Sequence, residues 1–295
     1  MRQNFPEKFS IVGKCTTAGY AAPQMKAPLT AHAAGPAQTV GRAVELLRLV
    51  ASSHSRHLRL VDIAAMAGLD KSTAHRLLQR LVQERMLARD PGVRGYRLGP
   101  LLHELGLAAP PASNLRELAL PALRQLAKAT GDMTFLVVRS GLETVCLHRT
   151  PGNFAIRTLS QSVGDRHPMG AGVGGLAIMA ALPDTEVRSV ARALADPLRY
   201  YGMTEKQLQE RIAATRARGY ALDEGTAARD VTAIGRAVRD KRRAPVAAVL
   251  VAGIRSRMTE VRQREVDVRL AECIADIESA IEPAARAVSA RTALR

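Results

Sequence analysis

The sequence predicts a two-domain protein of mixed α+β or α/β architecture, with a small, mainly helical N-terminal domain and a larger C-terminal domain of helices and strands. Three observations lead to this prediction. The chain has 295 residues, which exceeds the usual size of one domain. Short helical patterns separated by a glycine turn precede residue 99, and strand-like apolar runs alternate with helical patterns beyond residue 115.

Composition and charge narrow the class of protein. The net charge of +16 favours polyanionic partners, nucleic acid first. No apolar run approaches the ~20 residues that span a bilayer, and no segment resembles a secretion signal. The three cysteines are far apart, as is usual in a reducing compartment. We therefore expect a cytoplasmic protein with no membrane contact.

The N-terminal third begins with a tail and a helix. Residues 1–36 mix Ala, Pro and Gly without periodicity, which predicts a flexible tail. From Thr39, a residue suited to a helix N-cap, apolar Val40, Val44, Leu47 and Val50 recur at helical spacing. We expect the first helix there.

Two further helices follow, separated by a glycine. Leu60–Leu69 forms a short helical pattern that Gly68 is suited to stop in the left-handed conformation. The segment from Asp70 to Leu87 resumes the helical spacing. Its outward face carries donors and small hydroxyls: Lys71, Ser72, Thr73, His75, Arg76, Gln79 and Arg80.

Helix, turn and basic helix is the order of a helix-turn-helix motif, in which the second helix enters the major groove of DNA. Arg and Lys donors suit guanine edges, Gln suits adenine, and hydroxyls suit phosphates. Met86–Arg89 and Gly95–Leu98 can then pair as a hairpin wing, with Arg94 near its tip beside the phosphate backbone. The sequence thus predicts a winged helix-turn-helix over residues 37–99. An exposed helix with an ordinary polar face is the alternative for its third helix taken alone.

Residues Gly68–Leu78 and Gly95–Pro100 closely resemble the IclR family of bacterial regulators. The resemblance extends over about residues 39–290. It implies a winged helix-turn-helix, a linker over residues 100–114, and a GAF-like α/β effector-binding domain over residues 115–290. Pro110 and Pro111 depart from the family's helical linker and predict a break or kink.

The C-terminal pattern supports that layout independently. Met133–Arg139 and Glu143–Arg149 resemble paired strands, and the apolar run Pro245–Ile254 suits a buried strand. Helical spacing marks Leu115–Ala129, Thr204–Arg218 and Glu260–Ala287.

Gly170–Gly175 formally matches the G-x-G-x-x-G dinucleotide motif, but the polar residues before it predict a loop rather than the required strand. Asp196 lies about twenty residues further on, beside Pro197 rather than at a strand end. We therefore expect the glycines to lead into a helix whose N-terminal N–H groups can receive a carboxylate.

The resemblance also implies an effector site for a small organic acid. The family's ligand-contacting backbone positions fall on Val173 and Gly174, with Met169 as a nearby wall, and its polar rim falls on Asp223, Ala233, Leu250 and Ala252. Leu176 replaces a lysine common in the family, so we expect a more apolar pocket that favours an aromatic or branched acid. Core packing is the alternative for Leu250 and Ala252, and a helix-terminal or turn role is the alternative for Asp223.

No catalytic constellation or metal site emerges from the sequence. His148, Cys146 and His167 lack partners at ligand spacing, so core or surface roles are favoured. We expect a regulator rather than an enzyme, with no cofactor, acting as a homodimer or dimer of dimers on a pseudo-palindromic operator. The alternatives are a small-molecule-binding enzyme with an accessory nucleic-acid domain, and a DNA-organising protein that ignores sequence and ligand.

Overall fold

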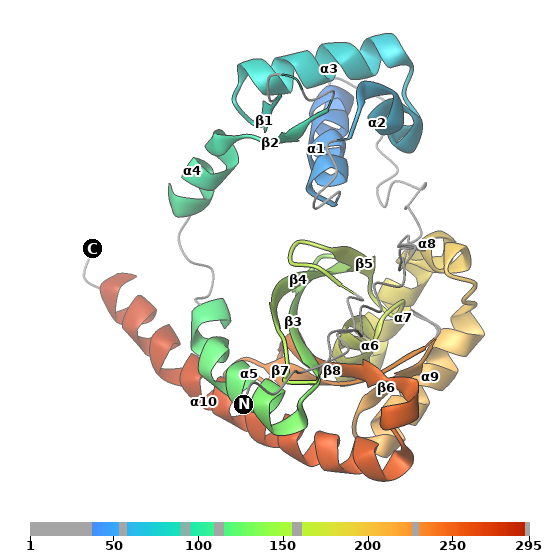
Figure 1. Ribbon diagram of the computed structural model, residues 1–295, viewed down its shortest axis with the longest axis vertical. Coiled ribbons are helices and arrows are strands. Elements are labelled where there is room, and N and C mark those ends of the chain that lie inside the picture. The colour runs from blue at the N-terminus through green and yellow to red at the C-terminus, as the bar shows by residue number, and fades with distance from the viewer. Residues whose placement is uncertain are drawn as a thin grey trace, which may run out of the picture.

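The computed structural model describes residues 37–52, 58–89, 92, 95–108, 115–154, 161–225 and 230–292. Figure 1 shows two bodies joined through the short helix α4. The tail predicted for residues 1–36 and the wing residue Arg94 lie outside the described part. Of the helices described, none is both long enough and apolar enough to cross a membrane.

The N-terminal body consists of three helices and a two-stranded sheet. The elements are α1 (Ala37–Ser52), α2 (Leu60–Ala67), α3 (Lys71–Gln83), β1 (Leu87–Ala88) and β2 (Arg97–Leu98). Leu46, Ile63 and Leu78, one from each helix, are fully buried and form its core. Gly68 ends α2 in the left-handed conformation as predicted. Thr39 lies inside α1, so its predicted role as N-cap is wrong.

Helix α3 ends earlier than the sequence predicts. The apolar spacing predicts a helix to Leu87, but α3 ends at Gln83 and Leu87 begins β1. Arg85 adopts φ 58°, and the N–H of Met86 donates to the carbonyl of Leu81. This is the hydrogen bond of a Schellman cap, with arginine where glycine is usual. The missing glycine left the sequence without a stop signal.

The wing is present with shorter strands than predicted. β1 and β2 pair antiparallel, Leu87 opposite Leu98. Tyr96 is buried, and its N–H donates to the carbonyl of Leu58 ahead of α2. Arg89 lies over the Tyr96 ring at 5.3 Å from its centroid. These contacts fasten the base of the wing to the three-helix core.

The linker begins as a helix, α4 (Pro100–Ala108). Gly99, the residue before this helix, lies against the backbone of Arg85. A Cβ on Gly99 would lie 2.1 Å from the carbonyl oxygen of Arg85. The Glu104 carboxylate pairs with Arg85 at 2.6 Å. The break predicted at Pro110 and Pro111 lies outside the described residues.

The C-terminal body contains six strands and six α-helices among the described residues. Its strands are β3 (Met133–Ser140), β4 (Glu143–Thr150), β5 (Arg166–Pro168), β6 (Ala221–Glu224), β7 (Val231–Arg239) and β8 (Pro245–Ile254). Its helices are α5 (Leu115–Thr130), α6 (Val173–Ala181), α7 (Asp184–Ala193), α8 (Ala195–Tyr200), α9 (Glu205–Arg218) and α10 (Glu260–Thr292), with a 3-10 turn at Arg255–Arg257. The hairpin and the strand Pro245–Ile254 are confirmed.

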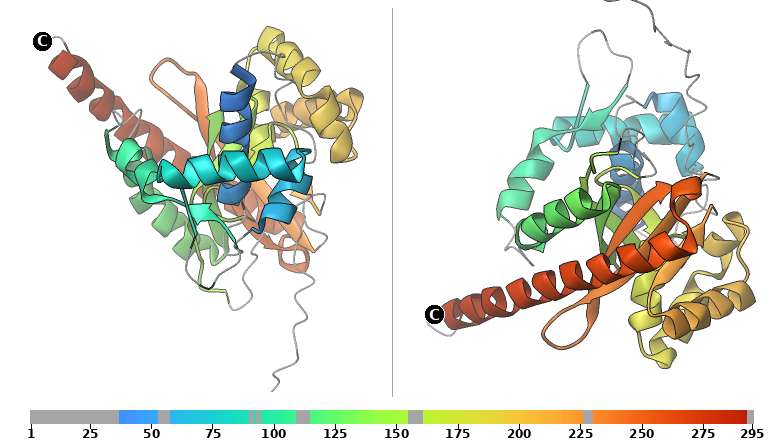
Figure 2. Two further views of the ribbon diagram at one scale, coloured as in Figure 1. Left: turned by 90° about the horizontal axis from the view of Figure 1, so that it is seen from above. Right: turned by 60° about the horizontal axis from the view of Figure 1, so that its bottom comes forward.

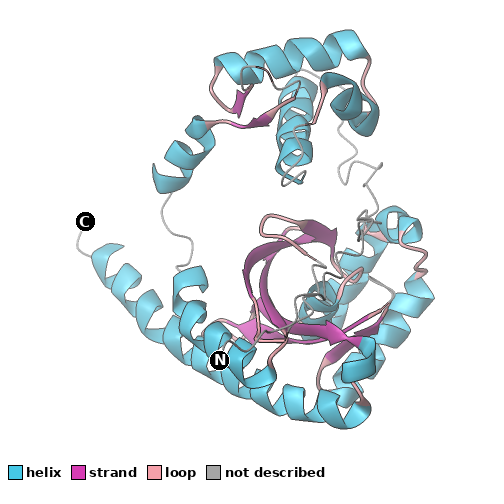
Figure 3. Ribbon diagram, viewed as in Figure 1, coloured by secondary structure: helices cyan, strands magenta, loops and turns pink. Residues whose placement is uncertain are grey.

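The sheet has the order β5-β4-β3-β8-β7-β6, and all its pairs are antiparallel. The fold is therefore α+β rather than a doubly wound parallel sheet. Figure 3 shows that the sheet curls, and Figure 2 shows α10 running beside α5, with its C-terminal end extending past the rest of the body.

Each face of the sheet has its own core. On one face, Phe135 and Ala252 pack with residues of α6, α7 and α9. On the other, Leu136 and Val251 pack with residues of α5 and α10. The alternation of neighbouring residues between two apolar layers explains why β8 is a continuous apolar run.

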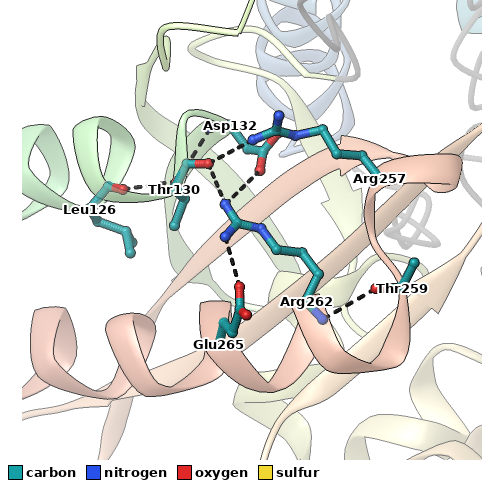
Figure 4. A network of polar contacts seen from close by, with 7 residues as sticks. All are labelled: Leu126, Thr130, Asp132, Arg257, Thr259, Arg262 and Glu265. Carbon is teal, nitrogen blue, oxygen red and sulfur yellow. Dashed lines mark hydrogen bonds and ion pairs between the residues drawn. The ribbon is translucent and has the colours of Figure 1, made fainter.

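A polar network joins α5, β3 and α10 (Figure 4). Asp132, 4% exposed, accepts from Nε of Arg257 at 3.1 Å and faces Nη2 of Arg262 at 3.8 Å. Both arginines also donate to the carbonyl of Thr130, the last residue of α5. Arg262 further pairs with Glu265 at 3.0 Å. The carbonyl at the end of α5, which has no partner within the helix, is thus satisfied by Arg257 of the 3-10 turn and Arg262 of α10.

Candidate functional site

Helix α3 presents the polar face that the sequence predicts. Its inner side buries Ala74, Leu78 and Leu81. Of the predicted DNA-binding residues, five are exposed and two are half-buried: Lys71, Ser72, Arg76, Gln79 and Arg80 are exposed, and Thr73 and His75 are half-buried. The face is continuous along the helix and is free of apolar side chains at these positions.

Asp70 caps this helix, a role that the sequence reasoning missed. Its carboxylate accepts from the N–H of Thr73 at 2.8 Å and from the hydroxyl of Ser72 at 2.6 Å. These hydrogen bonds hold the pKa of the Asp70 carboxyl well below its usual range. An anionic cap weakens the attraction of this N-terminus for phosphate. The signal was in the sequence, since Asp is a preferred N-cap residue.

The two central arginines of the face differ in their partners. Arg76 donates to the neutral hydroxyl of Thr73 at 3.4 Å. Arg80 forms an ion pair with Glu84, one turn further on, at 2.6 Å. Arg76 therefore carries the less compensated charge of the two.

On the C-terminal body, the glycine-rich segment leads into α6 as predicted. Gly172 is the N-cap residue, and no side chain caps the helix. The first residues of the helix, Val173 and Gly174, are buried. A Cβ on Gly174 would lie 2.5 Å from Cγ2 of Val137 and 3.0 Å from Cδ2 of Leu250. The glycine thus lets the start of α6 approach the sheet closely.

The short strand β5 corrects one premise of the sequence analysis. Arg166–Pro168 was expected to be loop, but it pairs with Glu143–Val145 of β4 and ends two residues before Gly170. It is an antiparallel edge strand, so the segment is not the βαβ unit that a dinucleotide motif requires. Asp196 lies in α8.

The predicted effector residues gather on one face of the sheet. Asp223 pairs with Ala233, and Ala233 pairs with Ala252, so the three form a row across β6, β7 and β8. Ala221, Gly235 and Leu250 form the parallel row two residues away. Both rows face α6, because alternate residues of a strand share a face and Ala221, Leu250 and Ala252 pack in the core on that side.

The packing around Leu250 connects that face to the helix. A Cβ on Gly235 would lie 2.7 Å from Cγ1 of Val173 and 3.2 Å from Cβ of Leu250. Leu250 is 6% exposed, and Ala252 is 1% exposed. Met169 is fully buried in the same core. The structure therefore brings Met169, Val173, Gly174, Asp223, Ala233, Leu250 and Ala252 to one layer between α6 and the sheet.

Asp223 is buried in strand β6, so the helix-terminal or turn alternative is wrong. Its carboxylate pairs with Nη2 of Arg211 on α9 at 3.3 Å. The sequence reasoning missed Arg211. One signal was available, since Arg211 lies between the core residues Leu208 and Ile212 and therefore beside the inward face of α9.

Burial shifts the pKa values of Cys146, His148 and His167 toward their neutral forms. Burial, reinforced by Asp165, raises the pKa of the Cys146 thiol to about 12. Burial, with Arg116 and Arg124 nearby, lowers the pKa of His148, and burial also lowers the pKa of His167. In the part of the chain that the structure describes, no three His, Cys, Asp or Glu side chains lie together in a group that could hold a metal ion.

A helix-turn-helix body joined to an α+β body of this kind defines a DNA-binding transcriptional regulator with a separate second domain. Comparison with known families agrees. The IclR helix-turn-helix domain matches residues 39–91, and the bacterial transcriptional regulator IclR C-terminal domain matches residues 109–279. The chain belongs to the IclR family of bacterial transcriptional regulators.

Individual relatives support the assignment. The chain is 28% identical over 240 residues to the transcriptional repressor IclR of Escherichia coli (strain K12), covering 80% of this chain and 87% of the repressor. An IclR regulator from Alicyclobacillus acidocaldarius has a similar crystal structure, with a TM-score of 0.66 and 25% identity. The match covers 82% of this chain and 98% of that regulator. An IclR homologue from Microbacterium hydrocarbonoxydans, complexed with 4-hydroxybenzoate, shares the fold with a TM-score of 0.63 and 24% identity. The match covers 83% of this chain and 99% of that homologue.

Proposed function

We propose that the chain is a regulator whose operator binding is controlled by a small organic acid. In this proposal α3 enters the major groove, and Lys71, Ser72, Thr73, His75, Arg76, Gln79 and Arg80 contact the DNA. The observation that carries it is the continuous basic and polar outer face of α3. Arg94, from the wing, contacts the phosphate backbone beside the groove.

The effector site of this proposal lies between the start of α6 and the sheet. The first turn of α6 is buried and has no side-chain cap, so its N–H groups suit a carboxylate. Leu250, Ala252 and Ala233 make the adjoining wall apolar. We therefore propose an acid larger than glyoxylate or pyruvate, aromatic or branched. The complex of the Microbacterium hydrocarbonoxydans homologue with 4-hydroxybenzoate supports an aromatic acid, because that protein has the same fold.

Two contributions to the binding free energy favour the larger acid. Each additional buried methylene contributes about 0.8 kcal/mol. A small keto acid leaves its second polar group against hydrocarbon, at a cost of roughly 1 to 3 kcal/mol. Among acids without a polar group opposite the carboxylate, affinity should therefore follow hydrophobicity.

Two experiments test the proposal. Footprinting on genomic DNA fragments that the chain retains should show a defined protected site, whereas protection without a defined site would indicate a DNA-organising protein. A thermal-shift screen over aliphatic and aromatic carboxylates should find acids that raise the melting temperature, because a ligand that binds only the folded state stabilises it. Tight binding of glyoxylate without binding of benzoate would overturn the effector assignment.

A further inference from the structure

Arg211 of α9 places a guanidinium beside the proposed effector layer. Its Nη2 lies 3.3 Å from Oδ1 of Asp223, and the two side chains are 21% and 4% exposed. Leu208 lies one turn before Arg211 on α9 and packs against the glycine-rich segment Gly170–Gly175. Its Cδ1 lies 2.7 Å from the position that a Cβ on Gly170 would take. Arg211 therefore reaches the sheet face from the same side as the loop that leads into α6.

One nitrogen of this guanidinium has no partner. Nη1 of Arg211 is buried and makes no hydrogen bond with any described residue. A buried donor without an acceptor destabilises the folded state, and more so when the group is charged. Such a group in a folded protein calls for an acceptor from elsewhere, and a bound ligand is one source.

The Arg211–Asp223 pair lies a short distance from the start of α6 along the same face of the sheet. Val173 lies over Gly235 and Leu250, which belong to one row of the sheet. Asp223 belongs to the next row on the same face, two residues along the strands. Gly235 and Asp223 are diagonal neighbours on adjacent strands, which places them roughly 7 to 8 Å apart. This separation is about the length of an aromatic acid from its carboxylate to a group across the ring.

The charge of the pair selects the kind of acceptor. The Asp223 carboxylate already balances the charge of Arg211. A second carboxylate next to Asp223 would meet a like charge in a buried setting. A hydroxyl or carbonyl oxygen accepts from Nη1 without adding charge, so it is the favoured partner.

We propose that Arg211 is a specificity-determining residue, whose Nη1 donates to a neutral hydroxyl or carbonyl oxygen on the end of the effector opposite its carboxylate. This inference rests on the proposed effector site and names its ligand class, a hydroxy or oxo acid with an apolar body. Hydrophobicity ranks acids that lack the distal group, and Arg211 then favours the acids that carry it.

The test is calorimetry on the full chain with matched acids. Benzoate, 4-methylbenzoate, and 3- and 4-hydroxybenzoate differ only in one ring substituent. A purely apolar pocket binds the methyl compound more tightly than the hydroxy compounds. With the Arg211 hydrogen bond, the better hydroxybenzoate should bind roughly tenfold or more tightly than either benzoate or 4-methylbenzoate, since hydrogen bonds to charged groups are strong and a site built for a hydroxyl rejects the analogue without it.

The key variant is Arg211→Met/Asp223→Leu, which removes both charges together and leaves no N–H donor at the position of Nη1. Arg211→Lys is unsuitable, because an ammonium group has three N–H donors and can serve Asp223 and the ligand together. The double variant should reduce the preference for hydroxybenzoate over 4-methylbenzoate from roughly tenfold to about one. Arg218→Met, at an exposed arginine on the same helix, is the control and should keep the full preference. If the double variant does not fold, Arg211→Ala/Asp223→Ala removes the same charges and the same donor and should show the same loss of preference.

The outcomes separate this inference from the proposed function. If benzoate or 4-methylbenzoate binds but the hydroxyl adds nothing, or if the preference persists in the double variant, Arg211 does not set specificity and the effector site stands. If none of the four acids binds, both the aromatic-acid assignment and this inference fail.

Discussion

Arg76 is the side chain that best tests which face of α3 contacts the bases of the operator. Arg80 is compensated by Glu84, whereas Arg76 contacts a neutral hydroxyl. Arg76→Ala should weaken specific operator binding by about 1 to 3 kcal/mol, the usual contribution of a base contact. Arg94→Ala, in the wing, should instead weaken binding to all duplexes and flatten its salt dependence. Unchanged operator affinity of Arg76→Ala at fixed salt would show that another face of α3 meets the bases.

Leu250 and Ala252 decide whether the effector layer is a ligand wall or plain core. Serine at both positions should shift preference toward smaller, more polar acids, because the wall then offers hydrogen bonds. Calorimetry over a ligand series measures the ranking. Val249→Ser is the control, since Val249 is buried on the opposite face of the same strand. If the double variant and the control give the same ranking as the unchanged chain, Leu250 and Ala252 only pack.

At the scale of elements, the junction between wing and linker depends on Gly99. A Cβ there meets the backbone of Arg85, which cannot move away as a flexible side chain can. Gly99→Ala should therefore lower the free energy of unfolding of the N-terminal body by roughly 2 to 3 kcal/mol. Gly106→Ala is the matched control in α4, with open space around it, and should stabilise by about 0.5 to 1 kcal/mol. Urea unfolding followed by circular dichroism compares them, and equal effects would refute the packing argument.

Asp132 holds α5 and α10 together at the start of β3. Asp132→Ala leaves Arg257 and Arg262 without their buried anion, while both guanidinium groups keep the Thr130 carbonyl and partial access to water. The expected loss is about 2 kcal/mol, less than for a fully buried pair. Glu265→Ala removes an exposed partner of Arg262 and should cost under about 1 kcal/mol. Thermal unfolding of both variants measures the difference, and a loss for Asp132→Ala no larger than for Glu265→Ala would contradict this account.

The elements that the sequence predicted correctly are those with strong local patterns. The strand Pro245–Ile254 is buried on both faces and has uniformly apolar residues, and Thr204 and Gly219 bracket α9 with regular caps. The end of α3 was missed because Arg85 occupies a position where glycine is expected. The short strand β5 was missed because pairing with β4, rather than its own residues, makes it a strand.

The family resemblance predicted which residues belong to the candidate effector site, but not which of them contact one another. Which side chains share a row depends on the register of β6, β7 and β8, and register is a long-range property. The Arg211–Asp223 pair joins residues of different elements for the same reason. Helical spacing places Arg211 beside the inward face of α9, but no local pattern identifies Asp223 as its partner.

For the molecule as a whole, we predict a symmetric assembly. One winged helix covers too few base pairs to find a single site in a genome, and a dimer reading two half-sites is the usual solution. The helix α4 offers surface for this, since it buries no residue and exposes Leu105 and Leu107 at 50% and 74%.

Leu105→Asp/Leu107→Asp should therefore shift the sedimentation of the full chain toward a monomer and reduce affinity for a two-site operator far more than for one half-site. The physical reason is that two half-sites bound through one assembly gain from effective concentration, and separated chains lose that gain. Glu104, on the same helix and paired with Arg85, provides the control variant Glu104→Gln, which should leave assembly intact. A chain that sediments as a monomer before any substitution, and still binds one half-site tightly, would contradict the symmetric assembly itself.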